Sequence, residues 1–225
     1  MCGRFNVTDN PQLTSLLERL GIDLRLPTRV NIAPTEQVAI VIHQESERQI
    51  RDMRWWLVPS WAKEVSTRYS MFNARAETLE TSRAFRGPFR HRRGIIPASS
   101  FIEWKSLDGK KQPWLVERTS NALAFAAIWE SRESGDEIME SCAIVTVEAA
   151  AGVKRLHSRM PLMLEPELFE TWLDPAVDID QLRKILVPHV PTGLQRRQLS
   201  MAINNSRTKT PELLVGLSEA ENLEQ

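Results

Sequence analysis

The sequence predicts a single α+β domain, in which a mixed or antiparallel β-sheet forms an open, barrel-like core with short flanking helices. Three observations favour this class. The 225 residues fit one large domain slightly better than two small ones. Short segments rich in β-branched and aromatic residues outnumber the helical segments. These segments do not alternate regularly with helices, as they would in a βαβ fold. We expect the domain to span residues 1–215, and the acidic, polar residues 216–225 to form a flexible tail.

The first elements follow from local patterns in the N-terminal part of the chain. Asn10, Pro11 and Gly21 frame a short amphipathic helix, because asparagine caps a helix, proline suits its first turn and glycine ends it. Residues 37–43 and 53–58 are rich in β-branched and aromatic side chains, and we predict a strand at each.

Further short strands are expected in the rest of the chain. Asp108 and Gly109 are a strong hairpin signal, and they join the segment FIEWK at 101–105 to PWLVE at 113–117. The remaining predicted strands lie at 95–96, 122–129, 143–147 and 161–164, and the remaining predicted helices at 148–156, 166–173 and 179–186.

Composition and charge exclude several classes of protein. Lysine plus arginine equal aspartate plus glutamate at 29 each, so the chain carries no global charge of the histone kind, although a local basic patch is compatible with that balance. Cys2 and Cys142 are too few for a disulfide scaffold or a multi-cysteine metal site, and we expect no metal and no other cofactor. No apolar run approaches the roughly 20 residues of a membrane span. The N-terminus lacks a signal-peptide pattern, so we expect a cytoplasmic protein.

Cys2 is the first candidate for chemistry. If Met1 is removed, Cys2 carries an α-amine and a thiol, whose reference pKa values are about 7.7–8.0 and about 8.5. Both groups then have a reactive fraction near neutral pH. The amine can attack an aldehyde to give an imine, and the thiol can close onto the imine carbon as a five-membered thiazolidine. An incidental cysteine at an exposed terminus is the alternative.

A basic and aromatic region is the second candidate. The segment NARAET at 73–78 precedes five arginines within residues 83–93, and their planar forks suit phosphate oxygens. Three tryptophans lie just before this region, and an exposed tryptophan can stack on a nucleic-acid base. A solvated loop paired with acids, and tryptophans in the core, are the alternatives. The residues are Arg83, Arg86, Arg90, Arg92 and Arg93, with Trp55, Trp56 and Trp61.

Two side chains are candidates for proton transfer. Glu103 shares a strand face with Phe101, and apolar surroundings raise the pKa of a carboxyl group toward neutrality. His157 lies on a loop before an apparent strand and can act as acid or base near neutral pH. A glutamate facing water on an edge strand, and a surface or structural histidine, are the alternatives.

Six short motifs occur in a fixed order along most of the chain. They are MCGRF at 1–5, NIAPT at 31–35, WLVPSW at 56–61, NARAET at 73–78, FIEW at 101–104 and HSRMP at 157–161. Together they resemble the family of SOS-response-associated peptidases (SRAP), also called abasic-site processing proteins. Asn204 and Asn205, followed by PEL at 211–213, resemble the C-terminal segment of that family.

The resemblance implies an enzyme that captures DNA damage. Met1 would be removed by self-processing, and Cys2 would form a thiazolidine crosslink with the ring-opened aldehyde of an abasic site, shielding the lesion during the DNA damage response. Asn73 would position the amine and the sugar. Glu103 would assist Met1 removal and sugar-ring opening, and His157 would exchange protons with the sugar oxygen and the imine. The DNA-binding residues would be Arg4, Pro34, Trp61, Arg75, Arg83 and Arg159.

The implied partners are single-stranded DNA containing abasic sites and proteins of the replication fork, with the protein itself a monomer. The sequence departs from the family pattern at Trp56, where glycine is usual, and around Ser100, where glycine and an aromatic residue are common. These changes affect the expected contacts with flanking bases rather than the chemistry of Cys2. Crosslinking is expected to weaken at acid pH, as the amine becomes protonated.

Two other functions stay open. Cys2 could be the nucleophile of an amidohydrolase such as a glutaminase, but no glutamine-pocket motif can be placed and the arginine run has no role there. Alternatively, the chain could bind single-stranded DNA without catalysis, which predicts equal binding to intact and abasic DNA.

Overall fold

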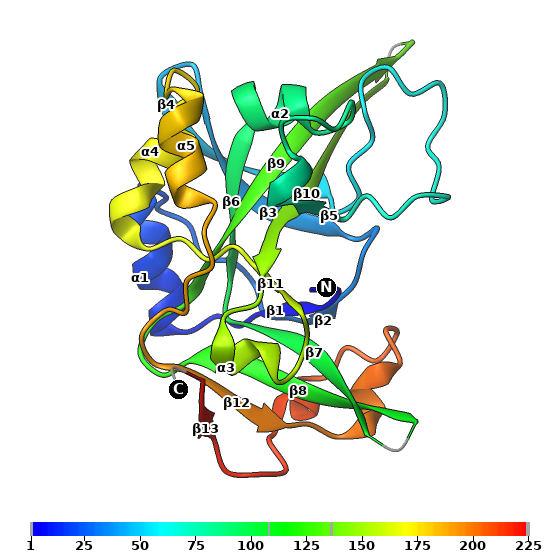
Figure 1. The fold of residues 1–225 in the computed structure, drawn as a ribbon, viewed down its shortest axis with the longest axis vertical. Helices are drawn as coiled ribbons and strands as arrows, with labels where there is room; N and C mark the ends of the chain where they lie inside the picture. Colours follow the sequence, from blue (N-terminus) through cyan, green and yellow to red (C-terminus); the bar gives the residue numbers. More distant parts are fainter. Residues whose placement is uncertain (1, 108, 136, 224–225) are drawn as a thin grey trace.

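The computed structural model describes residues 2–107, 109–135 and 137–223. Two sheets lie one above the other along the long axis of the molecule (Figure 1). The lower sheet has six strands. In order across the sheet they are β13 (Glu221–Asn222), β12 (Leu194–Gln198), β8 (Lys110–Arg118), β7 (Ser100–Leu107), β1 (Phe5–Val7) and β2 (Arg29–Ile32).

The upper sheet closes into a ring. Its strands in order are β11 (Arg159–Pro161), β10 (Glu137–Glu148), β4 (Glu47–Arg54), β3 (Gln37–Gln44), β6 (Arg93–Ala98) and β9 (Leu123–Ser134), and β5 (Asn73–Arg75) pairs with β10 outside this order. β10 pairs antiparallel with β9 and parallel with β4, so five strands return on themselves. The α+β class and the mixed sheet are confirmed. The expected open barrel is closed instead, because long β10 has both of these neighbours.

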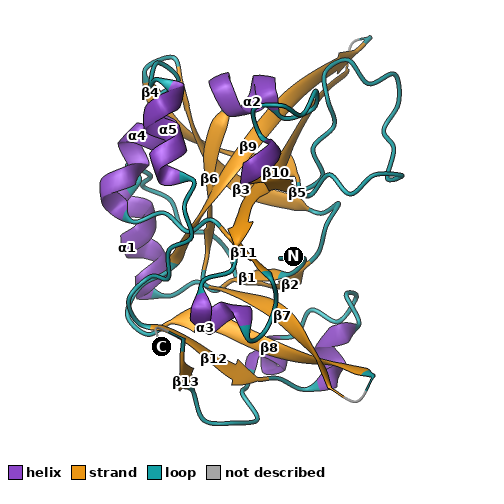
Figure 2. Cartoon of the chain, in the orientation of Figure 1, coloured by secondary structure: helices purple, strands orange, loops and turns teal. Residues whose placement is uncertain are grey.

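Short helices flank the ring, and α1, α4 and α5 lie together on one side of it (Figure 2). The α-helices are α1 (Pro11–Arg19), α2 (Arg86–His91), α3 (Ala151–Lys154), α4 (Phe169–Leu173) and α5 (Ile179–Ile185). The 3-10 helices are η1 (Ala76–Thr78), η2 (Pro166–Leu168), η3 (Met201–Asn204) and η4 (Pro211–Leu214).

The local signals at α1 and at the central hairpin are confirmed. Asn10 caps α1 by accepting a hydrogen bond from the backbone N–H of Leu13 at 2.9 Å, and Gly21 takes the left-handed conformation just after the helix (φ +73°). β7 and β8 pair antiparallel from Leu107 opposite Lys110 onward, as the hairpin signal predicts. Asp108 itself lies outside the described residues.

Two predicted elements, a strand and a helix, differ clearly from the structure. The strand predicted at 53–58 is β4, which begins at Glu47 and ends at Arg54. The sequence of this strand, ERQIRDMR, is charged and mostly half-buried, so it lacks the apolar pattern that predicts a strand. Trp55 lies just outside the strand and is buried by side-chain packing. The helix predicted at 148–156 is reduced to α3, because β10 continues to Glu148.

The C-terminal segment is not a free tail up to residue 223. Glu221 and Asn222 pair with β12, and the Leu223 side chain is 2% exposed. The backbone N–H of Leu223 donates to Leu194 O at 2.9 Å, and its carbonyl lies so close to Gly152 that an added Cβ there would be 1.7 Å away. Burial of the Leu223 side chain therefore holds the mostly acidic and polar C-terminal segment against the domain.

Phe5 joins the two sheets. It belongs to β1 in the lower sheet, and its ring packs edge-to-face against Trp55 and Phe125 of the upper part at centroid distances of 5.0 and 6.0 Å. Phe5 is almost fully buried. This packing fixes the start of the chain at the junction between the sheets, where Cys2 lies.

Candidate active site at the junction of the two sheets

Strand register brings Cys2 and Glu103 together. β1 and β7 pair antiparallel with Phe5 opposite Phe101, and the Ile102 N–H donates to Arg4 O at 3.0 Å, which extends the pairing toward the N-terminus. Glu103 therefore lies near the first residues of the chain. The Cys2 and Glu103 side chains are 0% and 1% exposed.

Asn73 reaches the same point from the upper sheet. β5 runs parallel to β10 with Asn73 opposite Ile144, and the Asn73 Nδ2 donates to Cys2 O at 2.8 Å. The Asn73 Oδ1 is buried and accepts no hydrogen bond from any residue that the structure describes. One end of this amide thus fixes the Cys2 backbone, and the other remains available as an acceptor.

His157 lies next to β11, which, like β5, pairs with β10. β11 pairs antiparallel with β10, and His157 lies two residues before the start of β11. The backbone N–H of Arg159 donates to His157 Nδ1 at 2.9 Å. This bond fits a neutral ring with its hydrogen on Nε2, whereas the contact of Nδ1 with the Arg159 carbonyl oxygen at 3.2 Å fits the tautomer with its hydrogen on Nδ1.

Burial controls the titration of the two central groups. Burial raises the pKa of the Glu103 carboxyl group, while the positive charges of the chain's N-terminus and of His157 act in the opposite direction. Burial also raises the pKa of the Cys2 thiol, and the Glu103 charge raises it further. The thiol is therefore protonated at neutral pH, and Glu103 holds a proton more readily than a carboxyl group in water.

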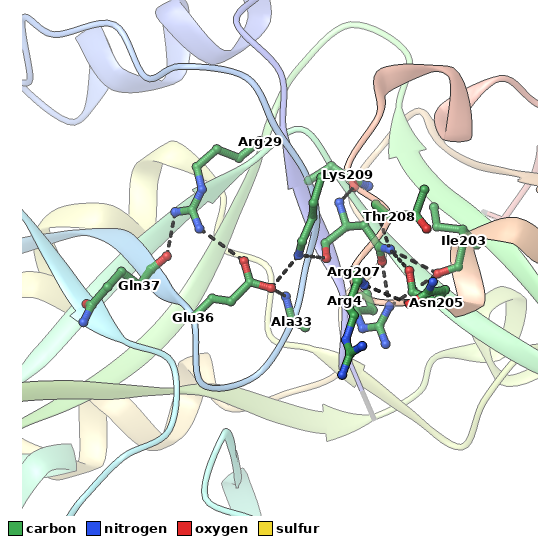
Figure 3. A network of polar contacts seen from close by, with 12 residues as sticks. Arg4, Arg29, Ala33, Glu36, Gln37, Ile203, Asn205, Arg207, Thr208 and Lys209 are labelled. Atoms are coloured by element: carbon green, nitrogen blue, oxygen red, sulfur yellow. Dashed lines mark hydrogen bonds and ion pairs between the residues drawn. The ribbon is translucent and has the colours of Figure 1, made fainter.

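Arg4 is held beside this cluster by a polar network that joins both ends of the chain (Figure 3). Its Nη1 donates to Asn31 Oδ1 at 2.7 Å, and its guanidinium lies 5.7 Å from the centroid of the Trp104 ring. Asn31 takes a left-handed conformation (φ +57°), which asparagine tolerates better than most residues. The Asn31 amide donates to the carbonyl oxygens of Ile203, Asn205 and Thr208 at 3.0–3.1 Å.

The loop that carries Pro34 is fixed by the same network. The Glu36 carboxylate accepts from the Ala33 N–H at 2.9 Å and pairs with Lys209, whose ammonium group also donates to Asn31 O. Pro34 itself is half-buried. Sequence reasoning missed Asn31, Glu36 and Lys209 as parts of the site. Only the NIAPT motif pointed to this region, and nothing in the sequence pairs it with residues 203–209.

Arg75 and Arg159 differ in what they contact. Arg75 is exposed and makes no ion pair with another described residue. Arg159 binds Glu77 through two hydrogen bonds of 2.6 and 2.9 Å and donates to Thr146 O at 2.6 Å. The Arg159 guanidinium thus links η1 to β10. Its hydrogen bonds with Glu77 lower the pKa of the Glu77 carboxyl group.

The arginine run does not form one continuous track. Arg93 is buried and donates to the carbonyl oxygens of Phe89, Arg90, Trp172 and Asp174. Arg92 pairs with Glu130 at 2.8 Å. These two arginines stabilise the fold and are not free for phosphate, whereas Arg83, Arg86 and Arg90 are exposed.

Trp61 and Arg83 lie together on the surface, whereas Cys2, Asn73 and Glu103 are buried. The Arg83 guanidinium stacks 4.2 Å from the centroid of the Trp61 ring. Trp56 packs inward, with its ring 5.5 Å from that of Phe72, so the larger side chain at this position does not project from the surface.

Ser100 also points into the protein. Its buried hydroxyl accepts a hydrogen bond from Asn6 Nδ2 at 2.9 Å, and Asn6 Oδ1 accepts from the Asn31 N–H at 2.7 Å. The residue that departs from the family pattern at this position therefore supports the network around Arg4.

Residues 2–107, 109–135 and 137–223 hold neither a cluster of metal ligands nor a membrane-spanning helix. No three of the histidine, cysteine, aspartate and glutamate side chains there gather closely enough to hold a metal ion. In the described part of the chain, no helix is long and apolar enough to cross a membrane.

Comparison with known proteins gives a consistent result. A family model described as "SOS response associated peptidase (SRAP)" matches residues 1–206. The chain is 35% identical to the abasic site processing protein YoqW of Bacillus subtilis over 95% of this chain and 99% of that protein. It is 30% identical to the abasic site processing protein YedK of Escherichia coli, again over 95% and 99%. The abasic site processing protein HMCES of Gallus gallus is 32% identical over 76% of this chain and 58% of its own length.

Solved structures share the fold. A protein from Bacteroides thetaiotaomicron superposes with a TM-score of 0.77 at 21% identity, covering 89% of this chain and 93% of its own. A phage-related protein from Bordetella bronchiseptica gives a TM-score of 0.72 at 27% identity, covering 89% and 95%.

Proposed function

The chain belongs to the SOS response associated peptidase family, and from that membership and the geometry of its site we propose that it processes abasic sites in DNA by covalent capture through Cys2. The observation that carries the proposal is the convergence of Asn73 and Glu103 on the second residue of the chain, with His157 near enough for its charge to act on Glu103. Proteins related to this chain over nearly their whole length are named abasic site processing proteins.

Removal of Met1 is the first step. Hydrolysis of the Met1–Cys2 peptide bond consumes one water and releases methionine and the Cys2 α-amine. Glu103 is the candidate general base for that water, since its pKa is raised by burial toward the range that suits proton transfer. The hydrogen bond from Asn73 to Cys2 O supports the step by holding the Cys2 backbone in place. Met1 itself lies outside the described residues.

Attack by the amine on the sugar aldehyde is the second step. The ring-opened abasic sugar presents its aldehyde carbon to the Cys2 nitrogen, and a C–N bond forms. Glu103 accepts one proton from the nitrogen and passes it to the former aldehyde oxygen, while His157 gives that oxygen a second proton and recovers the other proton of the nitrogen. That oxygen leaves as water, and an imine remains. The bond from the Arg159 N–H to Nδ1 favours Nε2 as the atom through which His157 gains and loses this proton.

Ring closure by the thiol is the third step. The sulfur bonds to the imine carbon, and the thiol proton moves to the nitrogen, giving a thiazolidine. The overall reaction of aldehyde and aminothiol releases one water. Burial keeps the Cys2 thiol protonated, which supports the amine as the first nucleophile and the thiol as the second.

The DNA strand is bound by residues around the buried cluster. Arg4 and Arg75 contact the phosphates next to the lesion, and Arg159 supports the site by holding η1 against β10 through Glu77. Pro34 shapes the path of the strand. Trp61 and Arg83 contact it further out, as a stacked aromatic and cationic pair.

A denaturing gel tests the proposal. Protein whose loss of Met1 has been verified by mass spectrometry is incubated with a single-stranded oligonucleotide carrying one abasic site, beside an undamaged oligonucleotide. We expect a heat-stable, slower band only with abasic DNA. Cys2→Ala should abolish this band, and Cys142→Ala, which removes the other buried thiol, should retain it. No band from Met1-free protein would contradict covalent capture.

A further inference from the structure

The loop at 59–70 exposes two aromatic rings, each stacked by an arginine. Trp61 is 52% exposed and Tyr69, the chain's single tyrosine, is 68% exposed. Arg83 lies 4.2 Å from the Trp61 ring centroid, and Arg68 lies 5.6 Å from the Tyr69 ring centroid. The loop therefore presents two large aromatic rings to solvent, and the free face of such a ring can stack on a flat ligand.

The loop is held in shape from beneath, although it forms no strand. Arg132, buried on β9, donates to the carbonyl oxygens of Ala62 and Lys63 at 2.7 and 2.8 Å. The Trp56 indole N–H donates to Ser66 O at 3.2 Å. These bonds fix the middle of the loop and leave its rings outside, so little conformational entropy remains to be lost when a ligand binds.

The loop is continuous with the candidate active site. It projects from the side of the molecule next to β5, as Figure 1 shows. Tyr69 precedes Asn73 by four residues, so their backbones are at most about 14 Å apart. The loop carries Lys63 and Arg68 against one acid, Glu64, and exposed Arg75 lies just beyond it. A ligand at this position is therefore favoured to be both flat and anionic.

We infer that loop 59–70 is a second DNA contact, in which Tyr69 and Arg68 stack on a base of the strand outside the abasic nucleotide while Trp56 and Arg132 hold the loop in position. Every base has a face that an aromatic ring can stack on, so this contact is independent of sequence. The guanidinium of Arg68 lies over the ring and can also reach a phosphate. The inference rests on the proposed function in one respect: the loop is taken to bind the same DNA strand that carries the abasic site.

Fluorescence anisotropy with an undamaged, labelled ten-nucleotide strand tests the contact. Stacking contributes about 1–3 kcal/mol per base, and at the lower end Tyr69→Leu should weaken binding roughly 5-fold. Tyr69→Phe keeps the ring and should bind like the original protein. Leu24→Ala, at an exposed apolar position on the α1–β2 connection, is the matched control and should have no effect.

Charge is tested in the same assay. Arg68→Gln should weaken binding and reduce its dependence on salt, whereas Arg25→Gln, another exposed arginine far along the chain from the loop, should change neither. Equal affinity of Tyr69→Leu and the original protein would overturn the inference. Equal weakening by Tyr69→Phe and Tyr69→Leu would also overturn it, because the hydroxyl and not the ring would then be responsible.

Failure of the inference can be told apart from failure of the proposed function. The anisotropy assay uses undamaged DNA and requires no crosslink. If the original protein forms no crosslink with abasic DNA while Tyr69→Leu still weakens binding, covalent capture is wrong and the loop contact stands. If crosslinking proceeds and Tyr69→Leu binds normally, the loop contact is wrong and capture stands.

Discussion

The buried cluster around Cys2 and the exposed loop at 59–70 are built in opposite ways. Cys2 and Glu103 are almost fully buried and are aligned by the pairing of β1 with β7, and Asn73 is aligned by the pairing of β5 with β10. The loop has no strand partner, and side chains beneath it hold its carbonyl groups. Proton transfer and bond formation need fixed atoms with controlled pKa values, which sheet register and burial supply. Binding of an extended strand needs accessible rings and charges.

The difference predicts that chemistry and affinity can be altered separately. Changes in the cluster should lower the rate of crosslinking at saturation, because the proposed mechanism places the reacting atoms there. Changes in the loop should shift the concentration at which saturation occurs, because the proposed loop contact with DNA lies outside the reacting nucleotide.

The largest effect is expected at Cys2. Cys2→Ser keeps the α-amine and replaces the thiol by a hydroxyl, which closes the ring less stably. We expect durable crosslinking to fall by at least about 1000-fold. The imine should still form, so borohydride reduction should trap Cys2→Ser on abasic DNA and leave Cys2→Ser on intact DNA untouched. A heat-stable band from unreduced Cys2→Ser would show that the thiol is not required.

Glu103→Gln should give the next largest effect. Glutamine keeps the shape of the side chain and removes the group that accepts and returns protons, so the saturated rate should fall about 100-fold or more. Loss of Met1 should slow as well, and intact-mass spectrometry measures that directly. Glu117→Gln is a matched control, since Glu117 pairs with Arg197 on the lower sheet. Normal rates in Glu103→Gln would remove Glu103 from the mechanism.

Weakening the support of the loop should have a smaller effect. Trp56→Phe retains a ring against Phe72 but removes the indole N–H that donates to Ser66 O. We expect affinity for single-stranded DNA to fall about 2- to 5-fold, which corresponds to one neutral hydrogen bond, with the saturated rate of crosslinking unchanged. Anisotropy and the gel assay measure the two quantities. A loss of saturated rate without a loss of affinity would contradict the separation of the two regions.

The smallest predicted effect concerns stability and pH. Burial raises the pKa of Glu103 in the folded protein above its value of about 4.3 in the unfolded chain, so the folded state binds more protons between these two values. The contribution of Glu103 to stability is therefore complete below pH 4 and is lost as the pH rises through the folded pKa. Glu103→Gln should melt a few °C above the original protein at pH 7, with a smaller difference at pH 4. An equal difference at both pH values would contradict this cause.

The cluster could be predicted from the sequence because short motifs carry it. Cys2, Asn73, Glu103 and His157 each lie in a motif, and the structure brings Cys2, Asn73 and Glu103 together by ordinary strand pairing. Their burial could not be deduced from the pattern. The alternation around Glu103 fits a strand facing water equally well, and only the pairing of β7 with β1 excludes that alternative.

Other features had no local signal. The network of Asn31 with residues 203–208 joins positions more than 170 apart along the chain, so no local pattern reveals it. Arg93 looked like part of a phosphate track, but four carbonyl oxygens from two separate segments surround it. The position of Leu223 depends on Gly152 leaving room for its carbonyl group, which is a property of the packed protein.

The most direct test of the division between the two regions is the rate of single-turnover crosslinking measured against protein concentration. An abasic oligonucleotide at trace concentration is mixed with the original protein, Glu103→Gln or Tyr69→Leu, all free of Met1. We predict that Glu103→Gln lowers the limiting rate without moving the half-saturating concentration. Tyr69→Leu should raise the half-saturating concentration roughly 5-fold and reach the original limiting rate. A lower limiting rate in Tyr69→Leu, or an unchanged one in Glu103→Gln, would contradict the account.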